Sequence, residues 1–267
     1  MFCDAHFHLV QYRTFSAENI PFDSYRACTC SHDRSEYSEQ QQLIEKVKQP
    51  VFLYNAFGIH PQNPVAANLP FLEALLRKNE LDAIGEAGFD LFTPEFKATI
   101  ERQEVVWRSQ VELAVQYQRP LIIHCRKSLD RIFRDSRLLM KLPGVIFHSF
   151  SGSITEAGSF LRRGIPAFFS FGKPLLNGHK RALECVRSLP AERLLFETDA
   201  PFQTLKNESF TTPGDIYRVY TTAAAVRLEA GSTCATLEEL KIQIEKNFIS
   251  VFGMFPVKSA EFLHRNV

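Results

Sequence analysis

Two histidines close to the N-terminus have the spacing of a metal-binding pair. His6 and His8 are separated by a single residue, and side chains alternate in an extended segment, so both imidazoles point to the same side. Neutral imidazole is a common metal ligand, and two of them can hold one cation. A His-x-His pair also occurs in chains with no metal role, so it predicts a metal site only together with further ligands.

Four further candidate ligands each follow a short apolar run, and they are Glu86, His124, His148 and Asp199. Taken singly, a histidine in such a place is more often a hydrogen-bonded structural residue, and Asp199 could cap a helix that begins at Ala200. Their joint occurrence with the first pair favours metal ligation. Mixed histidine and carboxylate ligands suit Zn, Mn, Ni and other divalent ions, and six ligands are enough for two ions.

A regular alternation of predicted strands and helices must position these residues. Eight short, mostly apolar runs are typical of strands covered on both faces, and they span 1–4, 25–30, 51–57, 81–85, 121–124, 145–148, 166–170 and 193–197. Helical patterns lie at 35–48, 69–79, 95–118, 129–140, 154–163, 176–188, 213–227 and 237–252. The alternation predicts an α/β fold, a (β/α)₈ TIM barrel that forms a single domain over residues 1–267. The alternative is an open doubly wound sheet, which the absence of G-x-G-x-x-G after the first strand disfavours.

The histidines are distributed unevenly over these elements. Barrel enzymes build their sites at the carboxyl ends of the strands, and five of the eight histidines come directly after predicted strands, namely residues 6, 8, 60, 124 and 148. His32, His179 and His264 lack such placement, and we expect them on the surface.

Composition and charge exclude several classes of protein. The 267 residues carry 31 Lys and Arg against 30 Asp and Glu, which leaves a net charge of +1, and 45% of them are hydrophobic. This composition excludes a disordered or collagen-like chain and a disulfide-dense miniprotein. Near-neutrality excludes the basic footprint of a protein that grips long duplexes through many phosphates. It does not exclude a small phosphate-bearing substrate, because bound metal ions would add positive charge.

The sequence also bears on the cellular location. Six cysteines are scattered without a C-x-x-C pair, which favours a reducing compartment. No apolar run approaches the ~20 residues needed to cross a bilayer, and the first residues lack the basic and apolar regions of a secretory signal. We therefore expect a cytoplasmic protein with no membrane contact and no obligate protein partner.

Six short motifs together resemble the TatD-type deoxyribonucleases of the metal-dependent amidohydrolase superfamily. They are Asp4-Ala-His6-Phe-His8-Leu9, Gly58-Ile59-His60-Pro61, Gly85-Glu86-Ala87-Gly88-Phe89-Asp90, Ile123-His124-Cys125-Arg126, His148-Ser149-Phe150-Ser151-Gly152 and Glu197-Thr198-Asp199-Ala200-Pro201. The resemblance covers nearly the whole chain and implies a barrel with two divalent metals (Mg, Mn, Zn or Ni). It implies that His6, His8 and Asp199 hold one metal, that His124 and His148 hold the second, and that Glu86 bridges them.

The chain departs from the family pattern in three places outside the proposed ligands. Phe89 stands where the family usually has Leu, Ser149 replaces a common Cys, and Lys206-Asn207-Glu208-Ser209 replaces the frequent Arg-Asn-Glu-Pro. The segment 11–54 is divergent and short in predicted helix. These departures bear on substrate preference and not on metal binding.

The resemblance implies hydrolysis of phosphodiester bonds in DNA, from an end of a single strand, by a water that two metals activate. Asp199 is the predicted general base and Glu86 the bridging catalytic ligand. His60 and Arg126 are predicted phosphate contacts, although Arg126 could equally be a solvated or ion-paired residue at the rim. Asp90 and Glu197 are predicted to orient the ligand imidazoles.

Two other functions stay open at this point. One is hydrolysis of another phosphoester, an amide or a lactone on the same binuclear site, since this fold serves many chemistries. The other is a non-catalytic scaffold that kept the motifs, which the intact ligand set disfavours.

Overall fold

Parallel strands in sequence order form the central sheet of the protein. The structure is a computed structural model that describes residues 1–15, 25–47 and 51–253. Its strands are β1 (Phe2–Phe7), β2 (Tyr25–Ser31), β3 (Val51–Phe57), β4 (Ala83–Asp90), β5 (Leu121–Arg126), β6 (Val145–Phe147), β7 (Ala167–Phe171) and β8 (Leu194–Phe196). Each strand pairs with the next in parallel, from β1 to β8. The predicted (β/α)₈ barrel is thereby confirmed.

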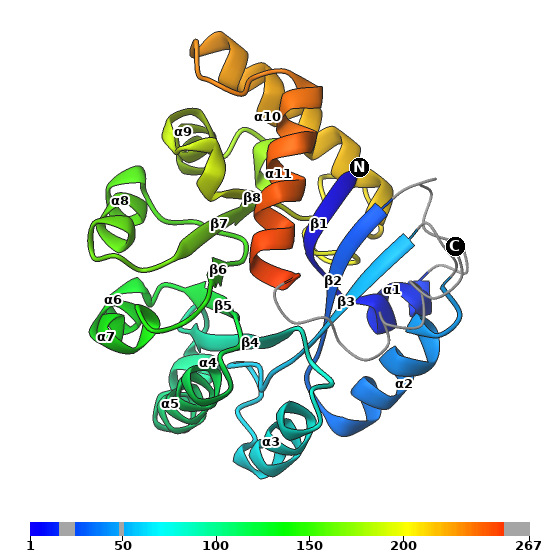
Figure 1. Cartoon of the computed structure of the whole chain (residues 1–267), viewed down its shortest axis with the longest axis vertical. Coiled ribbons are helices and arrows are strands. Elements are labelled where there is room, and N and C mark those ends of the chain that lie inside the picture. Colours follow the sequence, from blue (N-terminus) through cyan, green and yellow to red (C-terminus); the bar gives the residue numbers. More distant parts are fainter. Residues whose placement is uncertain (16–24, 48–50, 254–267) are drawn as a thin grey trace.

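Helices surround the strands on the outside of the barrel (Figure 1). They are α1 (Leu9–Phe15), α2 (Arg34–Ile44), α3 (Leu69–Arg77), α4 (Pro94–Lys97), α5 (Ile100–Tyr117), α6 (Leu129–Arg134), α7 (Ser136–Leu139), α8 (Ile154–Arg162), α9 (Lys180–Ser188), α10 (Ile216–Glu229) and α11 (Leu237–Phe252). Short 3₁₀ helices are η1 (Ala66–Asn68), η2 (Lys173–Leu175), η3 (Ala191–Arg193) and η4 (Pro213–Asp215). No helix within the described ranges is long and apolar enough to cross a membrane.

The predicted helices are found, with several corrected boundaries. The helix predicted over 95–118 is two helices, because Thr93 caps a short α4 and a break at Ala98 and Thr99 precedes α5. The helix predicted over 129–140 likewise divides into α6 and α7 at Asp135. Helix α1 was not predicted. The single-domain organisation over 1–267 stays a prediction, since 254–267 lie outside the described residues.

Strand β4 is longer than predicted and has a register shift beside the candidate site. It continues to Asp90 instead of ending at Gly85, and its register against β5 shifts between Ile84 and Ala87. A Cβ on Gly88, whose φ is +144°, would lie 2.0 Å from the carbonyl oxygen of His124. Only glycine tolerates this approach without a shift of backbone, so Gly88 allows β4 and β5 to lie close together beside Glu86.

A buried carboxylate joins the first strand to the segment that follows the last. Asp4 accepts hydrogen bonds from the Thr198 backbone N–H (3.0 Å), the Thr198 hydroxyl (2.6 Å), the Tyr25 hydroxyl (2.7 Å) and the His6 backbone N–H (3.2 Å). In addition, the backbone N–H of Asp199 donates to the carbonyl of His6 (3.0 Å). Through these bonds Asp4 fixes the relative position of two segments that carry candidate ligands.

We predict that Asp4→Asn lowers the free energy of unfolding by about 1–3 kcal/mol, because an amide group cannot accept all of these hydrogen bonds and buried donors lose their partners. Asp4→Ala should cost more. Urea denaturation measures the effect, and Tyr25→Phe, which removes a single donor, is the matched comparison with an expected cost of about 1 kcal/mol. An Asp4→Asn protein as stable as the wild type would contradict this role.

Candidate metal centre

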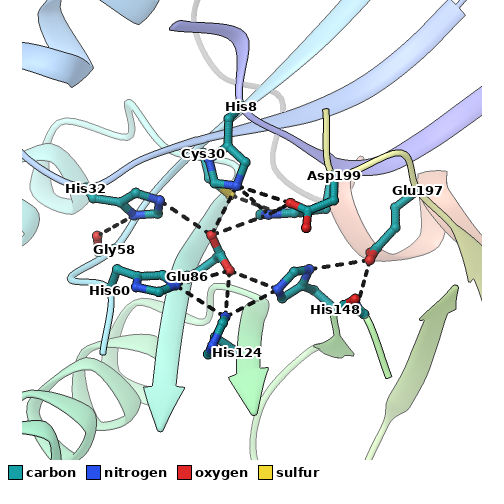
Figure 2. Close-up of polar contacts among 12 residues, drawn as sticks. His8, Cys30, His32, Gly58, His60, Glu86, His124, His148, Glu197 and Asp199 are labelled. Carbon is teal, nitrogen blue, oxygen red and sulfur yellow. Dashed lines mark hydrogen bonds and ion pairs between the residues drawn. The ribbon is translucent and has the colours of Figure 1, made fainter. Parts of the chain in front are cut away.

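All six predicted ligands come together at the carboxyl ends of the strands. His6 lies in β1 and His8 directly after it, Glu86 and His124 lie in β4 and β5, and His148 and Asp199 follow β6 and β8. They line or adjoin a cavity of about 890 Å³ at the mouth of the barrel. Figure 2 shows the Glu86 carboxylate at the centre, with the imidazoles pointing toward it from different strands.

One oxygen of Glu86 faces the first group of candidate ligands. Glu86 Oε2 lies 3.3 Å from His6 Nε2 and 3.4 Å from His8 Nε2. The two imidazole nitrogens are 3.1 Å apart, and Asp199 Oδ1 lies 3.5 Å from the first and 3.3 Å from the second. Four donor atoms from three strand ends thus surround one small space.

The other oxygen of Glu86 faces a second group. Glu86 Oε1 lies 2.9 Å from His148 Nε2, 3.2 Å from His124 Nδ1 and 3.6 Å from His60 Nε2. His124 Nδ1 is also 3.2 Å from His60 Nε2 and 3.4 Å from His148 Nε2. The predicted phosphate contact His60 therefore lies deep in the centre, among the candidate ligands.

Carboxylates behind the ring of imidazoles occupy the positions predicted for Asp90 and Glu197. Asp90 Oδ2 lies 3.1 Å from His124 Nε2 and accepts a hydrogen bond from the Gln62 amide (2.8 Å). Glu197 Oε1 lies 3.4 Å from His148 Nδ1 and accepts from the Ser149 backbone N–H (2.7 Å). Such contacts on the far nitrogen orient an imidazole toward a cation.

The two central carboxyl groups are held in the charged form. Burial would raise the pKa of Glu86, but the charges of neighbouring imidazoles, above all His6 and His148, hold it well below its usual range. Burial would also raise the pKa of Asp199, yet the hydrogen bond from His8 and the other imidazoles lower it to about 2. The centre therefore holds ionised carboxylates beside the imidazole rings.

This donor set fits divalent cations. Donor atoms within 4.8 Å of one another form four groups in the described residues, His6/His148/Asp199, His6/His8/Glu86, His60/Glu86/His124 and His8/His32/Glu36. Two ligands bound at about 2.1 Å to one ion are separated by about 3.0–3.4 Å, and the separations around Glu86 are of this size. The arrangement supports binding of divalent metal.

His32 is a residue that sequence reasoning placed wrongly. It was expected on the surface, but its Nε2 lies 3.4 Å from Glu86 Oε2, and the side chain is 21% exposed. The missed signal is its position directly after β2, the same placement that identified the other candidates. His179 is exposed and caps α9, as expected for a surface residue, and His264 lies outside the described residues.

No helix begins at Ala200, because residues 199–212 form turns and irregular structure up to η4. The alternative of Asp199 as a helix cap is therefore wrong.

Arg126 lies exposed at the rim of the cavity, with its guanidinium 4.2 Å from the centre of the Phe92 ring. This placement leaves Arg126 exposed at the opening of the cavity.

The family profile described as TatD related DNase matches residues 3–253 of the chain. Among curated proteins, the chain is 35% identical over 164 residues to the 3'-5' ssDNA/RNA exonuclease TatD of Edwardsiella piscicida, covering 57% of this chain and 60% of that protein. It is 30% identical over 219 residues to the uncharacterized metal-dependent hydrolase YabD of Bacillus subtilis, covering 76% and 82%. The match to the first of these proteins thus spans less than two thirds of its length.

Solved structures share the fold. The crystal structure of YJJV, a TATD homolog from Escherichia coli K12, superposes with a TM-score of 0.76 at 24% identity, covering 95% of this chain and 98% of that one. The structure of a TatD family hydrolase from Entamoeba histolytica gives the same TM-score at 19% identity, covering 94% and 97%.

We predict that divalent metal stabilises this protein through Glu86. Adding Mn²⁺ or Zn²⁺ at about 100 times its dissociation constant to metal-stripped protein should raise the free energy of unfolding by about 2.7 kcal/mol. Glu86→Gln, which keeps the shape but removes the charge, should abolish most of this gain. Glu101→Gln on the exposed face of α5 is the matched control. Thermal unfolding with and without metal measures this increase. If metal raised the free energy of unfolding of the Glu86→Gln protein as much as that of the wild type, Glu86 would be excluded as a ligand.

Proposed function

Since this chain belongs to the TatD related DNase family, we propose that it is a metal-dependent phosphodiesterase that removes nucleotides from an end of single-stranded DNA. The observation that carries the proposal is the Glu86 carboxylate, whose two oxygens face two separate groups of imidazoles at the mouth of a barrel. The relatives named as 3'-5' ssDNA/RNA exonucleases support the nucleic-acid substrate.

The proposed centre holds two divalent ions, with Mg, Mn, Zn and Ni as the candidates. His6, His8 and Asp199 would hold one, His124 and His148 the other, and Glu86 would be a ligand shared by both. When bound, such ions lower the pKa of water and neutralise charge on phosphoryl oxygens.

Asp199 is the proposed general base. Its Oδ1 faces the histidine pair, while its Oδ2 accepts a hydrogen bond of 2.7 Å from the Gln203 amide. The same amide also donates to the Ser149 hydroxyl at 2.6 Å, which fixes the Gln203 side chain. One oxygen of Asp199 therefore contacts the histidine pair, and the other contacts Gln203. Because the low pKa keeps Asp199 ionised at neutral pH, it can accept a proton from a water molecule beside the substrate phosphate.

Side chains at the rim provide the proposed substrate contacts. The Arg126 guanidinium and the Lys127 ammonium both lie over the Phe92 ring, at 4.2 and 4.5 Å from its centre. Phe92 itself is 48% exposed. A cationic group beside an exposed ring suits one phosphate and one unstacked base. Deeper in the cavity, His60 is the second proposed phosphate contact.

The charge of the chain favours a short binding site. A net charge of +1 gives the chain little overall attraction for a polyanion, so we expect phosphate charge to be met mainly at the metal centre and at the few cations of the rim. We therefore expect the protein to act on terminal nucleotides and to bind long duplexes poorly.

The six cysteines are all free thiols, and four of them are buried. Free thiols persist in reducing compartments, and we propose the cytoplasm as the place of action.

The test of the proposed function is a parallel substrate panel. Metal-loaded protein is given end-labelled single-stranded DNA, duplex DNA, closed circular duplex, RNA and small phosphoester, amide and lactone compounds. Products that shorten stepwise from one end of single-stranded DNA support the proposal. Rapid cutting of closed circular duplex, or turnover confined to the small compounds, would refute it.

We predict that Asp199→Asn lowers kcat on single-stranded DNA by a factor on the order of 10²–10⁴, because the amide keeps a ligating oxygen but cannot accept the proton. The melting temperature should stay near that of the wild type, since the side chain lies at the barrel mouth and not among the core layers. Asp130→Asn on the exposed face of α6 is the matched control. Normal turnover with normal metal content would remove Asp199 from the mechanism.

Substitutions of the two rim residues Arg126 and Phe92 should change the binding of single-stranded DNA in different ways. Arg126→Ala should lower the slope of log affinity against log salt by about 0.7, which is the contribution of one phosphate contact to a single strand. Phe92→Ala should weaken single-strand binding by about 1–3 kcal/mol with an unchanged salt slope, because stacking carries no charge. Fluorescence anisotropy across a salt series measures both values. Identical salt slopes in wild type and Arg126→Ala would show that Arg126 does not contact phosphate.

A further inference from the structure

His32 is held by two adjoining strand ends in one orientation. It follows β2, and Gly58 follows β3, where the Gly58 backbone N–H donates to the Ser31 carbonyl at 3.1 Å. His32 Nδ1 lies 3.2 Å from the Gly58 carbonyl oxygen. Because a carbonyl oxygen only accepts hydrogen bonds, Nδ1 must carry the hydrogen. In the neutral ring the lone pair is then on Nε2, which is the atom free to bind a cation.

This free nitrogen points at the centre of the metal site. His32 Nε2 lies 3.4 Å from Glu86 Oε2, the same oxygen that His6 Nε2 and His8 Nε2 approach at 3.3 and 3.4 Å. Its ring adjoins those of His8 and His60, with centroids 5.5 and 5.1 Å away. Figure 2 shows it entering from the side of the centre opposite Asp199.

The backbone that carries His32 is itself anchored. Glu36 Oε2 accepts a hydrogen bond of 2.7 Å from the His32 backbone N–H, and Glu36 Oε1 accepts one of 2.6 Å from the Gln11 amide. Asp33 caps α2 by accepting from the Glu36 backbone N–H at 2.9 Å. A solvated surface histidine needs none of these contacts, whereas a ligand is held in this way by the groups behind it.

Three imidazole nitrogens around one carboxylate oxygen are held together by positive charge, which protons on the rings or a cation between them can supply. Lone pairs on neutral imidazoles and on a carboxylate repel one another at short range. The separations of 3.3–3.4 Å from Glu86 Oε2 are longer than the usual 2.7–3.2 Å of an N–H···O hydrogen bond. They agree with the spacing of about 3.0–3.4 Å between ligands of one ion.

We propose that His32 is an additional metal ligand, which binds through Nε2 a divalent cation held also by His8 and Glu86 Oε2. The inference rests on the proposed metal centre but not on its nucleic-acid substrate. A further imidazole favours ions that accept nitrogen, such as Zn²⁺, Co²⁺ and Ni²⁺, over Mg²⁺, which prefers oxygen. His32 therefore biases this side of the centre toward the nitrogen-binding ions.

The test uses His32→Asn in the full-length, metal-stripped protein. The asparagine amide can still donate to the Gly58 carbonyl, but the Nε2 lone pair is lost. Competition with a chromophoric chelator measures the dissociation constants for Zn²⁺, Co²⁺ and Mg²⁺, and the visible absorption of bound Co²⁺ reports its ligands. We expect at least a tenfold loss of affinity at one site for Zn²⁺ and Co²⁺, a smaller change for Mg²⁺, and an altered Co²⁺ spectrum.

Two control variants make the result interpretable. His179→Asn removes an exposed imidazole while keeping a good helix cap, and its metal affinity should equal that of the wild type. His6→Ala should lose metal binding if the centre exists at all, so this variant tests the proposed function separately from His32. If His32→Asn folds poorly by circular dichroism, His32→Gln replaces it.

Two outcomes would overturn the inference. Tighter metal binding by His32→Asn would identify His32 as a protonated partner of Glu86 that competes with the cation. Unchanged affinities and an unchanged Co²⁺ spectrum, with His6→Ala still defective, would show that His32 faces the substrate or only the protein.

Discussion

The candidate metal centre of this protein is arranged around one buried carboxylate. Glu86 lies in a ring of imidazoles from several strand ends, and each of its oxygens faces a different group of them. An isolated buried carboxylate would cost several kcal/mol, so its environment must supply positive charge. Neighbouring histidines hold the pKa of Glu86 low, and divalent cations would satisfy both the carboxylate and the nitrogen lone pairs. The buried carboxylate and the imidazoles around it therefore depend on one another for their stability in this position.

The barrel is built so that this set can form. Gly88 lets β4 approach β5 closely where Glu86 and His124 meet, and Asp4 links β1 to the segment after β8, where Asp199 lies. Gly88 and Asp4 both determine where the backbone lies, and neither contributes an atom to the groups around Glu86. A (β/α)₈ barrel gathers side chains from distant parts of the chain because its parallel strands end at one face.

The rim of the cavity has a different character from its floor. The floor is made of histidines and carboxylates that are largely buried, whereas the rim presents Phe92 with Arg126 and Lys127 stacked over it. An exposed ring beside two cations suits the proposed single-stranded nucleic acid better than a small neutral ester. The proposed function assigns the floor to metal binding and the rim to substrate contacts, and the two parts of the cavity differ in side-chain type accordingly.

The sequence by itself determined the barrel and the six candidate ligands, because short apolar runs and the polar residues at their ends are local features. His6 and His8, for example, converge as soon as their segment is extended. Three features needed the tertiary structure: the continuation of β4 past Glu86, the deep position of His60 and the inward direction of His32. Strand β4 continues past Glu86 with a register shift against β5, and His60 lies beside His124, 64 residues away in the chain. The direction of His32 is set by the carbonyl of Gly58, a group on the neighbouring strand end 26 residues away, and no local pattern records such a contact.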